Sequence, residues 1–244
     1  QELDDLKNLT QLVPQGFGDD WLRFNGFGEV IIWEMHDGSR AGMQFNPSSE
    51  AKAALRTAFG WIAENGYGME IHAASDSSAQ QILDVLDEVN AETPIADLRW
   101  SILHIDAASV STLERMKALG VSFGLQSRLY TGGEALVELL GEDRARSAPP
   151  IKTALDLGLL VGGGTDALAV GPYNPWIAIR WLLDGKLISR EITRGPEEIP
   201  SRTQALRLYT YNGAWLQFAE DDRGSIEVGK MADIAVLSED YMAM

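Results

Sequence analysis

The sequence predicts an α/β fold with parallel strands, and a barrel is the favoured arrangement. Strand-like runs alternate with amphipathic helical stretches from residue 29 to residue 166, and such alternation is typical of parallel strands joined by right-handed crossovers. The sequence has no Rossmann Gly-x-Gly-x-x-Gly motif and no phosphate-binding loop that ends in Lys-Ser/Thr. Polar side chains follow directly after several predicted strands, which is where a barrel carries its functional residues.

The expected elements follow from caps, breakers and apolar periodicity. Ser48 begins a helix because its hydroxyl accepts hydrogen bonds from the first helical amides, and Gly120 ends another. We expect strands at 29–35, 69–72, 99–104 and 121–125, and in the apolar run that leads into Asp166. We expect helices at about 49–64, 79–90, 109–119, 151–157, 172–184 and 201–218. Residues 1–28 and 130–150 are expected to be irregular, and two short strands are expected at 224–230 and 232–237.

Composition and charge exclude several classes of partner. The net charge of −16 argues against nucleic acid, which needs a basic face, and against anionic membrane surfaces. No apolar run approaches the ~20 residues of a membrane span. The first residues lack the basic and apolar regions of a signal peptide, which favours the cytoplasm, although the absence of cysteine leaves the compartment open. We therefore expect a small-molecule substrate, with no nucleic acid and no membrane as partner.

Three of the predicted strands end in side chains that bind metals. His72 and His104 close two strands, and Asp166 follows an apolar run and three glycines, which leave room for backbone or a ligand. Two imidazoles and a carboxylate suit a divalent transition metal, with zinc favoured. A single histidine at a strand end is more often structural, and Asp166 could cap the segment that follows it. Three such residues at the same ends of their strands favour a metal site.

Other polar residues near the predicted strand ends have less specific roles. Arg128 is either a solvated loop cation or a clamp for a substrate carboxylate. His36 is read as a turn residue because it lies in His-Asp-Gly, and Glu34 as a solvent-exposed residue at the edge of its strand. Glu29 begins the same predicted strand.

Several motifs resemble those of one enzyme superfamily. They are Ile71-His72-Ala73-Ala74-Ser75-Asp76, Leu103-His104, Gly164-Thr165-Asp166-Ala167, Thr210-Tyr211-Asn212-Gly213-Ala214 and the tail from Gly224 to Leu237, which reads GSIEVGKMADIAVL. Together they resemble the amidohydrolase superfamily, and most closely amidohydrolase family 3, which includes N-substituted formamide deformylase-like proteins. The resemblance covers the chain from about Trp21 onward.

The resemblance implies a metal-dependent hydrolase of carbon–nitrogen bonds other than peptide bonds, acting on an amide or a cyclic amide. It implies a (β/α)₈ barrel with one or two divalent ions, most readily zinc. His72 and His104 would be ligands after strands five and six. Asp166, after strand eight, would be a ligand and would take a proton from the attacking water. Residues 1–222 would form strands four to eight of the barrel with their helices, and residues 223–244 would return into a small β-sandwich.

The chain departs from the family pattern in two places. The family's His-x-His pair after its first strand is absent, since the three histidines are His36, His72 and His104. The family's carboxylated lysine on strand four has no counterpart, and Glu29 is placed there instead, although another register would choose another residue.

These departures predict a fragment that begins near strand four of a partial barrel. A complementing N-terminal segment or a homo-oligomer would then be its partner. The alternative function is a non-catalytic barrel fragment, or a subunit whose site another chain completes. Metal-assisted chemistry other than hydrolysis is a third possibility, because a fold does not fix a reaction.

Overall fold

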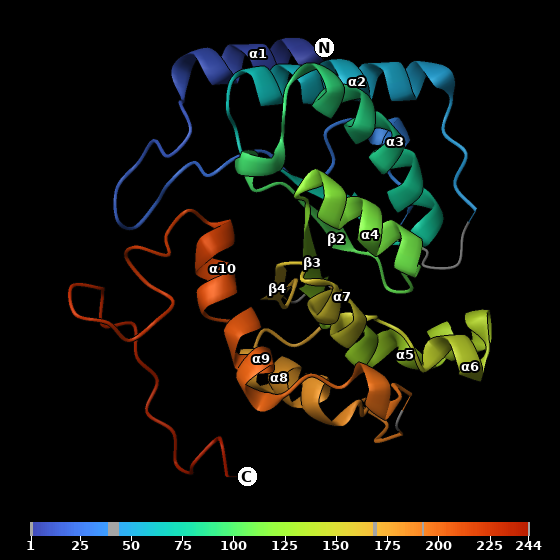
Figure 1. Ribbon diagram of the computed structural model, residues 1–244, viewed down its shortest axis with the longest axis vertical. Coiled ribbons are helices and arrows are strands. Elements are labelled where there is room, and N and C mark those ends of the chain that lie inside the picture. The colour runs from blue at the N-terminus through green and yellow to red at the C-terminus, as the bar shows by residue number, and fades with distance from the viewer. Residues whose placement is uncertain (1, 39–43, 168–169, 192, 244) are drawn as a thin grey trace. The chain divides into compact units, whose positions relative to one another are not determined.

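The computed structural model describes residues 2–38, 44–167, 170–191 and 193–243. The chain divides into two compact units. The first comprises residues 1–124 and 157–159, and the second comprises residues 125–156 and 160–244. Each unit has its own helices (Figure 1) and its own buried side chains.

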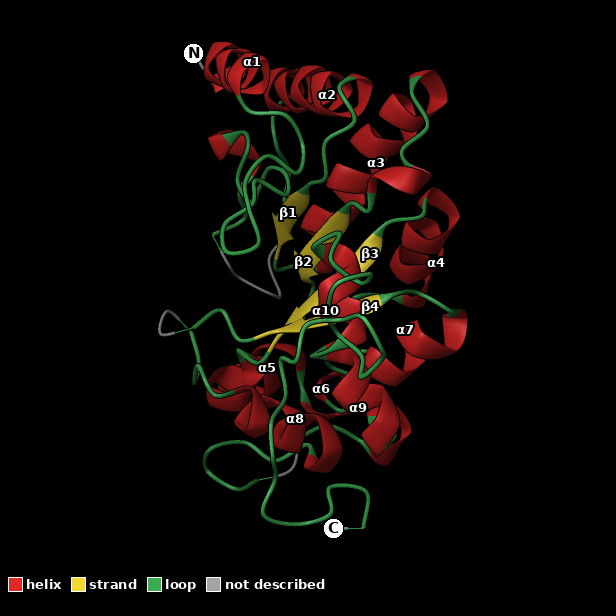
Figure 2. Cartoon of the chain, turned by 90° about the vertical axis from the view of Figure 1, so that its left-hand side faces the viewer, coloured by secondary structure: helices red, strands yellow, loops and turns green. Residues whose placement is uncertain are grey.

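The first unit is built on parallel strands covered by helices. Its strands are β1 (Glu70–Ala73), β2 (Ser101–His104) and the first part of β3 (Ser122–Gln126), and its helices are α1 (Glu2–Leu12), α2 (Ser49–Glu64), α3 (Asp76–Glu92) and α4 (Val110–Leu119), with 3₁₀ turns η1 (Trp33–Met35) and η2 (Ala96–Leu98). The three strands are parallel, and Ile71, Ile102 and Phe123 lie opposite one another in register. Helix α3 packs on β1, and α3 and α4 lie along the same side of the strands (Figure 2).

The main helices of this unit begin at serine residues that cap their N-termini. The hydroxyls of Ser48, Ser75 and Ser109 each accept a hydrogen bond from a backbone amide in the first turn of α2, α3 and α4. Helix α4 ends at Gly120, whose φ of 72° is a left-handed conformation that glycine adopts without strain. The predicted alternation of strands and helices is confirmed here, and so is the α/β class with a parallel sheet.

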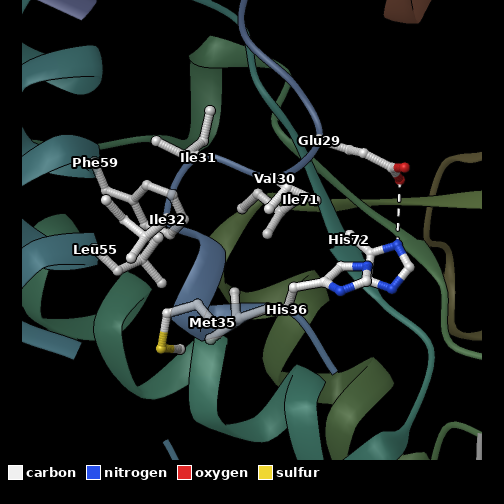
Figure 3. Close-up of a pocket in the computed structure, with 11 residues that line it drawn as sticks. Glu29, Val30, Ile31, Ile32, Met35, His36, Leu55, Phe59, Ile71 and His72 are labelled. Atoms are coloured by element: carbon white, nitrogen blue, oxygen red, sulfur yellow. Dashed lines mark hydrogen bonds and ion pairs between the residues drawn. The ribbon is translucent and has the colours of Figure 1, made fainter. Parts of the chain in front are cut away.

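The expected strand at residues 29–35 is wrong. The chain instead runs beside β1 only as far as Glu29: the Phe27 amide donates to the Gly68 carbonyl at 3.0 Å, and the His72 amide donates to the Glu29 carbonyl at 3.0 Å. The chain bends after Glu29 and then forms η1, and Ile32, its N-cap residue, and Met35, its last residue, are both buried (Figure 3). Residues three positions apart lie on the same side of a 3₁₀ turn. Residues 2–12 also differ from expectation, because they form α1.

The second unit contains mostly helices. Its elements are the end of β3, α5 (Leu129–Leu140), α6 (Glu142–Ala145), α7 (Ile151–Leu157, whose last residue belongs to the first unit), β4 (Val161–Gly164), α8 (Pro175–Asp184), η3 (Pro196–Glu198), α9 (Arg202–Leu208) and α10 (Tyr211–Leu216). Strand β4 lies next to the end of β3, where the Leu125 carbonyl lies close to Gly164. Helices α9 and α10 pack on β4.

Three expectations for this unit are wrong. The stretch expected to be irregular contains α5 and α6, and the single helix expected at 201–218 is broken at Thr210, whose φ and ψ are −126° and −98°. The described residues of the tail form no strand at 224–237, and Ile226, Val228 and Val236 are exposed. Two short strands are marginal without further strands to pair with. The return into a β-sandwich stays a prediction.

None of the described helices combines the length and the apolar character that a membrane crossing requires.

The glycines of β4 allow side chains from the helices to pack closely against the strand. A Cβ atom at Gly162 would lie 2.3 Å from Leu216 Cδ1, and one at Gly163 would lie 2.6 Å from Tyr209 Cε2. The Tyr209 hydroxyl also donates to the Gly164 carbonyl at 3.1 Å. At Gly162 and Gly163, therefore, the space left by the missing side chains is filled by α10 and by the residue that follows α9.

We expect Gly163→Ala to lower the free energy of unfolding by about 1–3 kcal/mol, because the added methyl group overpacks the contact with the Tyr209 ring. Denaturant-induced unfolding measures the change. Gly132→Ala in α5 is the matched control, since no atom lies within 4 Å of its new Cβ and alanine favours the helix. Equal stability of the Gly163→Ala variant and the wild type would contradict this account of β4.

Candidate metal centre

Glu29, His72 and His104 bring three potential ligand atoms together in the first unit. Glu29 Oε2 lies 3.0 Å from His104 Nε2 and 3.3 Å from His72 Nδ1. The three ligand atoms all lie within 4.8 Å of one another. Both histidines are 4% exposed, whereas the Glu29 side chain is 42% exposed, so the cluster reaches the surface through the glutamate. Figure 3 shows Glu29 and His72 with the interaction between them.

Adjacent parallel strands supply the two histidines. The register places His72 opposite Leu103, so a regular continuation of β2 would point His104 to the other face of the sheet. The φ of His104 is instead 74°, compared with about −120° in a parallel strand. This difference turns the Cβ of His104 by roughly half a circle about the N–Cα bond, and the two imidazole rings lie with their centroids 4.5 Å apart.

Asp37 holds the far side of the His72 ring. Its Oδ1 atom lies 3.0 Å from His72 Nε2, and its Oδ2 atom accepts hydrogen bonds from the Ala74 amide, the Ser75 amide and the Ser78 hydroxyl at 2.9, 2.9 and 2.5 Å. Asp37 is 1% exposed. The sequence indicates Asp37 only as part of the His-Asp-Gly turn, because no local pattern links it to a histidine 35 positions away.

The pKa shifts show which groups carry charge. Burial raises the pKa of Asp37, but hydrogen bonds from His72, Ser78 and Ser75 outweigh burial and hold that pKa well below its usual range. Burial also raises the pKa of Glu29, and the hydrogen bonds and charges of His104 and His72 reverse the shift. Burial lowers the pKa of His72, but Asp37 and Glu29 outweigh it, so the net shift is upward. Both carboxylates are thus ionised at neutral pH, and an ionised Asp37 can only accept from His72 Nε2.

The donor chemistry of this cluster fits a divalent metal ion. Two histidines and one glutamate form one of the three-ligand sets of catalytic zinc sites, which keep a further position open. Histidines that ligate metals commonly donate their second ring N–H to a carboxylate, and Asp37 Oδ1 lies within hydrogen-bond distance of His72 Nε2. Glu29, His72 and His104 are therefore the described residues that could hold an ion.

The remaining residues of interest lie outside this donor set. The His36 ring lies against the His72 ring, with centroids 4.3 Å apart and planes tilted by 38°, and its Nδ1 accepts from the Gly38 amide at 3.3 Å. Glu34 is exposed, as expected. Asp166 and Arg128 belong to the second unit, where Asp166 is exposed two residues after the end of β4 with a φ of 50° and Arg128 is half-buried before α5. The predicted roles of Asp166 and Arg128 stay predictions.

Comparisons with known proteins agree with the motifs. YtcJ of Bacillus subtilis (strain 168), named as an amidohydrolase, is 26% identical over 213 residues, which are 85% of this chain and 38% of that protein. The N-substituted formamide deformylase of Arthrobacter pascens is 29% identical over 218 residues, 86% of this chain and 38% of the enzyme. The chain thus spans well under half the length of these relatives.

Similarity to a solved structure and to a family model supports the same family. An uncharacterized metal-dependent hydrolase from Pyrococcus furiosus matches with a TM-score of 0.78 and 25% identity, over 98% of this chain and 50% of that one. This match is consistent with the predicted partial barrel. The model of the amidohydrolase family matches residues 1–244. The chain therefore belongs to the amidohydrolase family, family 3, as its motifs predicted.

Proposed function

We propose that this chain carries the metal centre of a hydrolase that cleaves a carbon–nitrogen bond, and that zinc is its ion. The observation that carries the proposal is the cluster of Glu29, His72 and His104, with ligand atoms within 4.8 Å of one another. The two buried imidazoles and the ionised glutamate supply the ligand types that zinc prefers. Family membership supports hydrolysis as the reaction class.

Each candidate residue has a proposed role in the reaction. Glu29, His72 and His104 would hold the ion. When bound, the ion would lower the pKa of a water molecule to about 7 and act as a Lewis acid on a carbonyl oxygen. Asp166 would take the proton of the attacking water and pass it to the leaving amine, because a carboxylate can serve in turn as base and acid. Arg128 would bind an acidic group of the substrate through its paired N–H donors.

An amide or a cyclic amide is the proposed substrate class, with N-substituted formamides as the first candidates. The name of the Arthrobacter pascens relative supplies this candidate. A small-molecule assay should therefore compare an N-substituted formamide, an N-acyl amine, a cyclic amide and a dipeptide.

Metal analysis of the purified chain tests the proposal directly. We expect one or two equivalents of zinc per chain after reconstitution, and release of amine from at least one of the non-peptide amides that stops when a chelator removes the ion. A chain that binds no zinc, manganese or iron at stoichiometric level, and shows no hydrolysis when these ions are added, would overturn the proposal.

A second candidate function is that of a subunit whose site another chain completes. Its support is that the chain spans 38% of each of two relatives and that its sequence has no His-x-His pair. Stoichiometric zinc without turnover, followed by turnover on mixing with a longer family member or an N-terminal segment of one, would favour this candidate. Size-exclusion chromatography would show whether a second copy of the chain is the partner.

Glu29→Gln tests whether the glutamate is a ligand. Loss of an outer-shell partner of a metal ligand lowers metal affinity by about 10–100-fold. We expect Glu29→Gln to lower the zinc affinity by more than this, because a charged direct ligand becomes a neutral amide. Isothermal titration with zinc measures the change. Glu34→Gln is the matched control, since Glu34 is exposed five positions away and lies outside the donor set. Similar affinities for the two variants would remove Glu29 from the site.

A further inference from the structure

We propose that Asp37 is a positioning residue that keeps the ring proton of His72 on Nε2 and thereby presents Nδ1 to the metal. The proposal deepens the proposed function, because it rests on His72 being a ligand there. Asp37 does not join the donor set itself. It acts through His72, whose Nε2 lies 3.0 Å from Asp37 Oδ1.

The two oxygens of the Asp37 carboxylate contact different groups. Oδ2 accepts from three donors, namely the backbone amides of Ala74 and Ser75 and the hydroxyl of Ser78. Oδ1 lies 3.0 Å from Nε2 of the His72 imidazole. Whatever atom occupies the Oδ2 position must therefore be an acceptor, because two of its partners are N–H groups that can only donate.

The position of this carboxylate is fixed by the connection between β1 and α3. Ala74 and Ser75 link the strand that carries His72 to helix α3, and Ser75 is the N-cap of that helix. Ser78 is fully buried in the first turn. A negative charge at a helix N-terminus is also favoured by the helix dipole. The same short segment therefore orients both the ring and the carboxylate that holds it.

Asparagine at position 37 would reverse the direction of the hydrogen bond to His72. The amide oxygen of Asp37→Asn must take the Oδ2 position, since three donors converge there. The NH₂ group then faces His72 Nε2 and donates to it, so Nε2 becomes the acceptor and the ring proton moves to Nδ1. A protonated Nδ1 cannot bind a metal ion, although the shape of the site is kept. The same logic explains why an Asp→Asn change in a serine-protease triad, where Asp also orients a histidine, leaves the geometry intact and lowers kcat.

Zinc affinity of the variant is the first test. We expect Asp37→Asn to weaken zinc binding by about 10–100-fold in isothermal titration, the usual cost of losing a partner of a metal-bound histidine. The matched control is Asp76→Asn, the same substitution in the first turn of α3. Asp76 accepts from the Ser109 amide and the Thr112 hydroxyl and touches neither histidine, so its variant should bind zinc as the wild type does.

The proton on the His72 ring is the second test, and it separates positioning from simple loss of structure. The chain has three histidines, so ¹⁵N spectra of the histidine-labelled, zinc-loaded protein are simple to assign. In the wild type we expect His72 to carry its proton on Nε2 and to bind zinc through Nδ1. This measurement needs no variant, and it therefore decides the proposal even if Asp37→Asn fails to fold.

The outcomes separate this inference from the proposed function. If the wild type binds no divalent ion, both fail. If the wild type binds zinc but its His72 ring ligates through Nε2, or if Asp37→Asn folds and binds zinc as tightly as Asp76→Asn does, the role of Asp37 is overturned and the proposed function stands. A weakened, folded Asp37→Asn variant together with an Nε2–H ring in the wild type supports the proposal.

Discussion

Asp166→Asn is expected to lower kcat by about 10²–10⁴-fold, the contribution that a positioned general base makes to a reaction of this kind. Asparagine matches aspartate in size but cannot accept a proton, so the attacking water would lose its base. The measurement is kcat at saturating zinc, on whichever amide the hydrolysis assay identifies. Zinc affinity, measured separately, reports the other predicted role, because loss of a ligand would raise the dissociation constant.

A carboxylate elsewhere in the second unit provides the control for Asp166. Asp156 is exposed on α7, where it pairs with Lys152, and Asp156→Asn should leave kcat unchanged. If Asp166→Asn kept the wild-type kcat, the catalytic role would be assigned to the wrong residue. If kcat held while zinc binding fell, Asp166 would be a ligand without being the base.

Trp100→Ala is expected to lower the free energy of unfolding by about 3–5 kcal/mol, which is a large fraction of the whole stability of an ordinary domain. Trp100 is fully buried directly before β2, with its ring centroid 5.7 Å from that of Phe59. Its indole N–H donates to the Tyr67 carbonyl at 2.8 Å, so alanine removes a hydrogen bond as well as the packed ring. Denaturant-induced unfolding followed by circular dichroism measures the loss.

A tryptophan on the surface of the same unit is the control for Trp100. The Trp21 side chain is 95% exposed, and Trp21→Ala should change stability by no more than about 0.5 kcal/mol. Comparable losses for the two variants would show that Trp100 is not a core residue. Since the Trp100 carbonyl also accepts from the Ser122 amide, loosening of this position should weaken the pairing of β2 with β3.

The sequence determined those features whose causes lie within a few residues of one another. Helices α2, α3 and α4 begin where Ser48, Ser75 and Ser109 offer a hydroxyl to an amide three positions on. The buried strands β1 and β2 end at or beside the histidines that were predicted to close them. The same local reasoning failed for residues 29–35, where a turn packed against α2 replaces alternation along a strand.

Only the tertiary structure decided how the metal centre is assembled. Glu29 reaches the histidines because its segment runs beside β1, and Asp37 reaches His72 across 35 positions of sequence. The left-handed φ of His104 brings its ring to the side of His72, against the alternation that the strand register dictates. Each of these features depends on contacts between segments far apart in the chain, whose energies no local pattern of residues records.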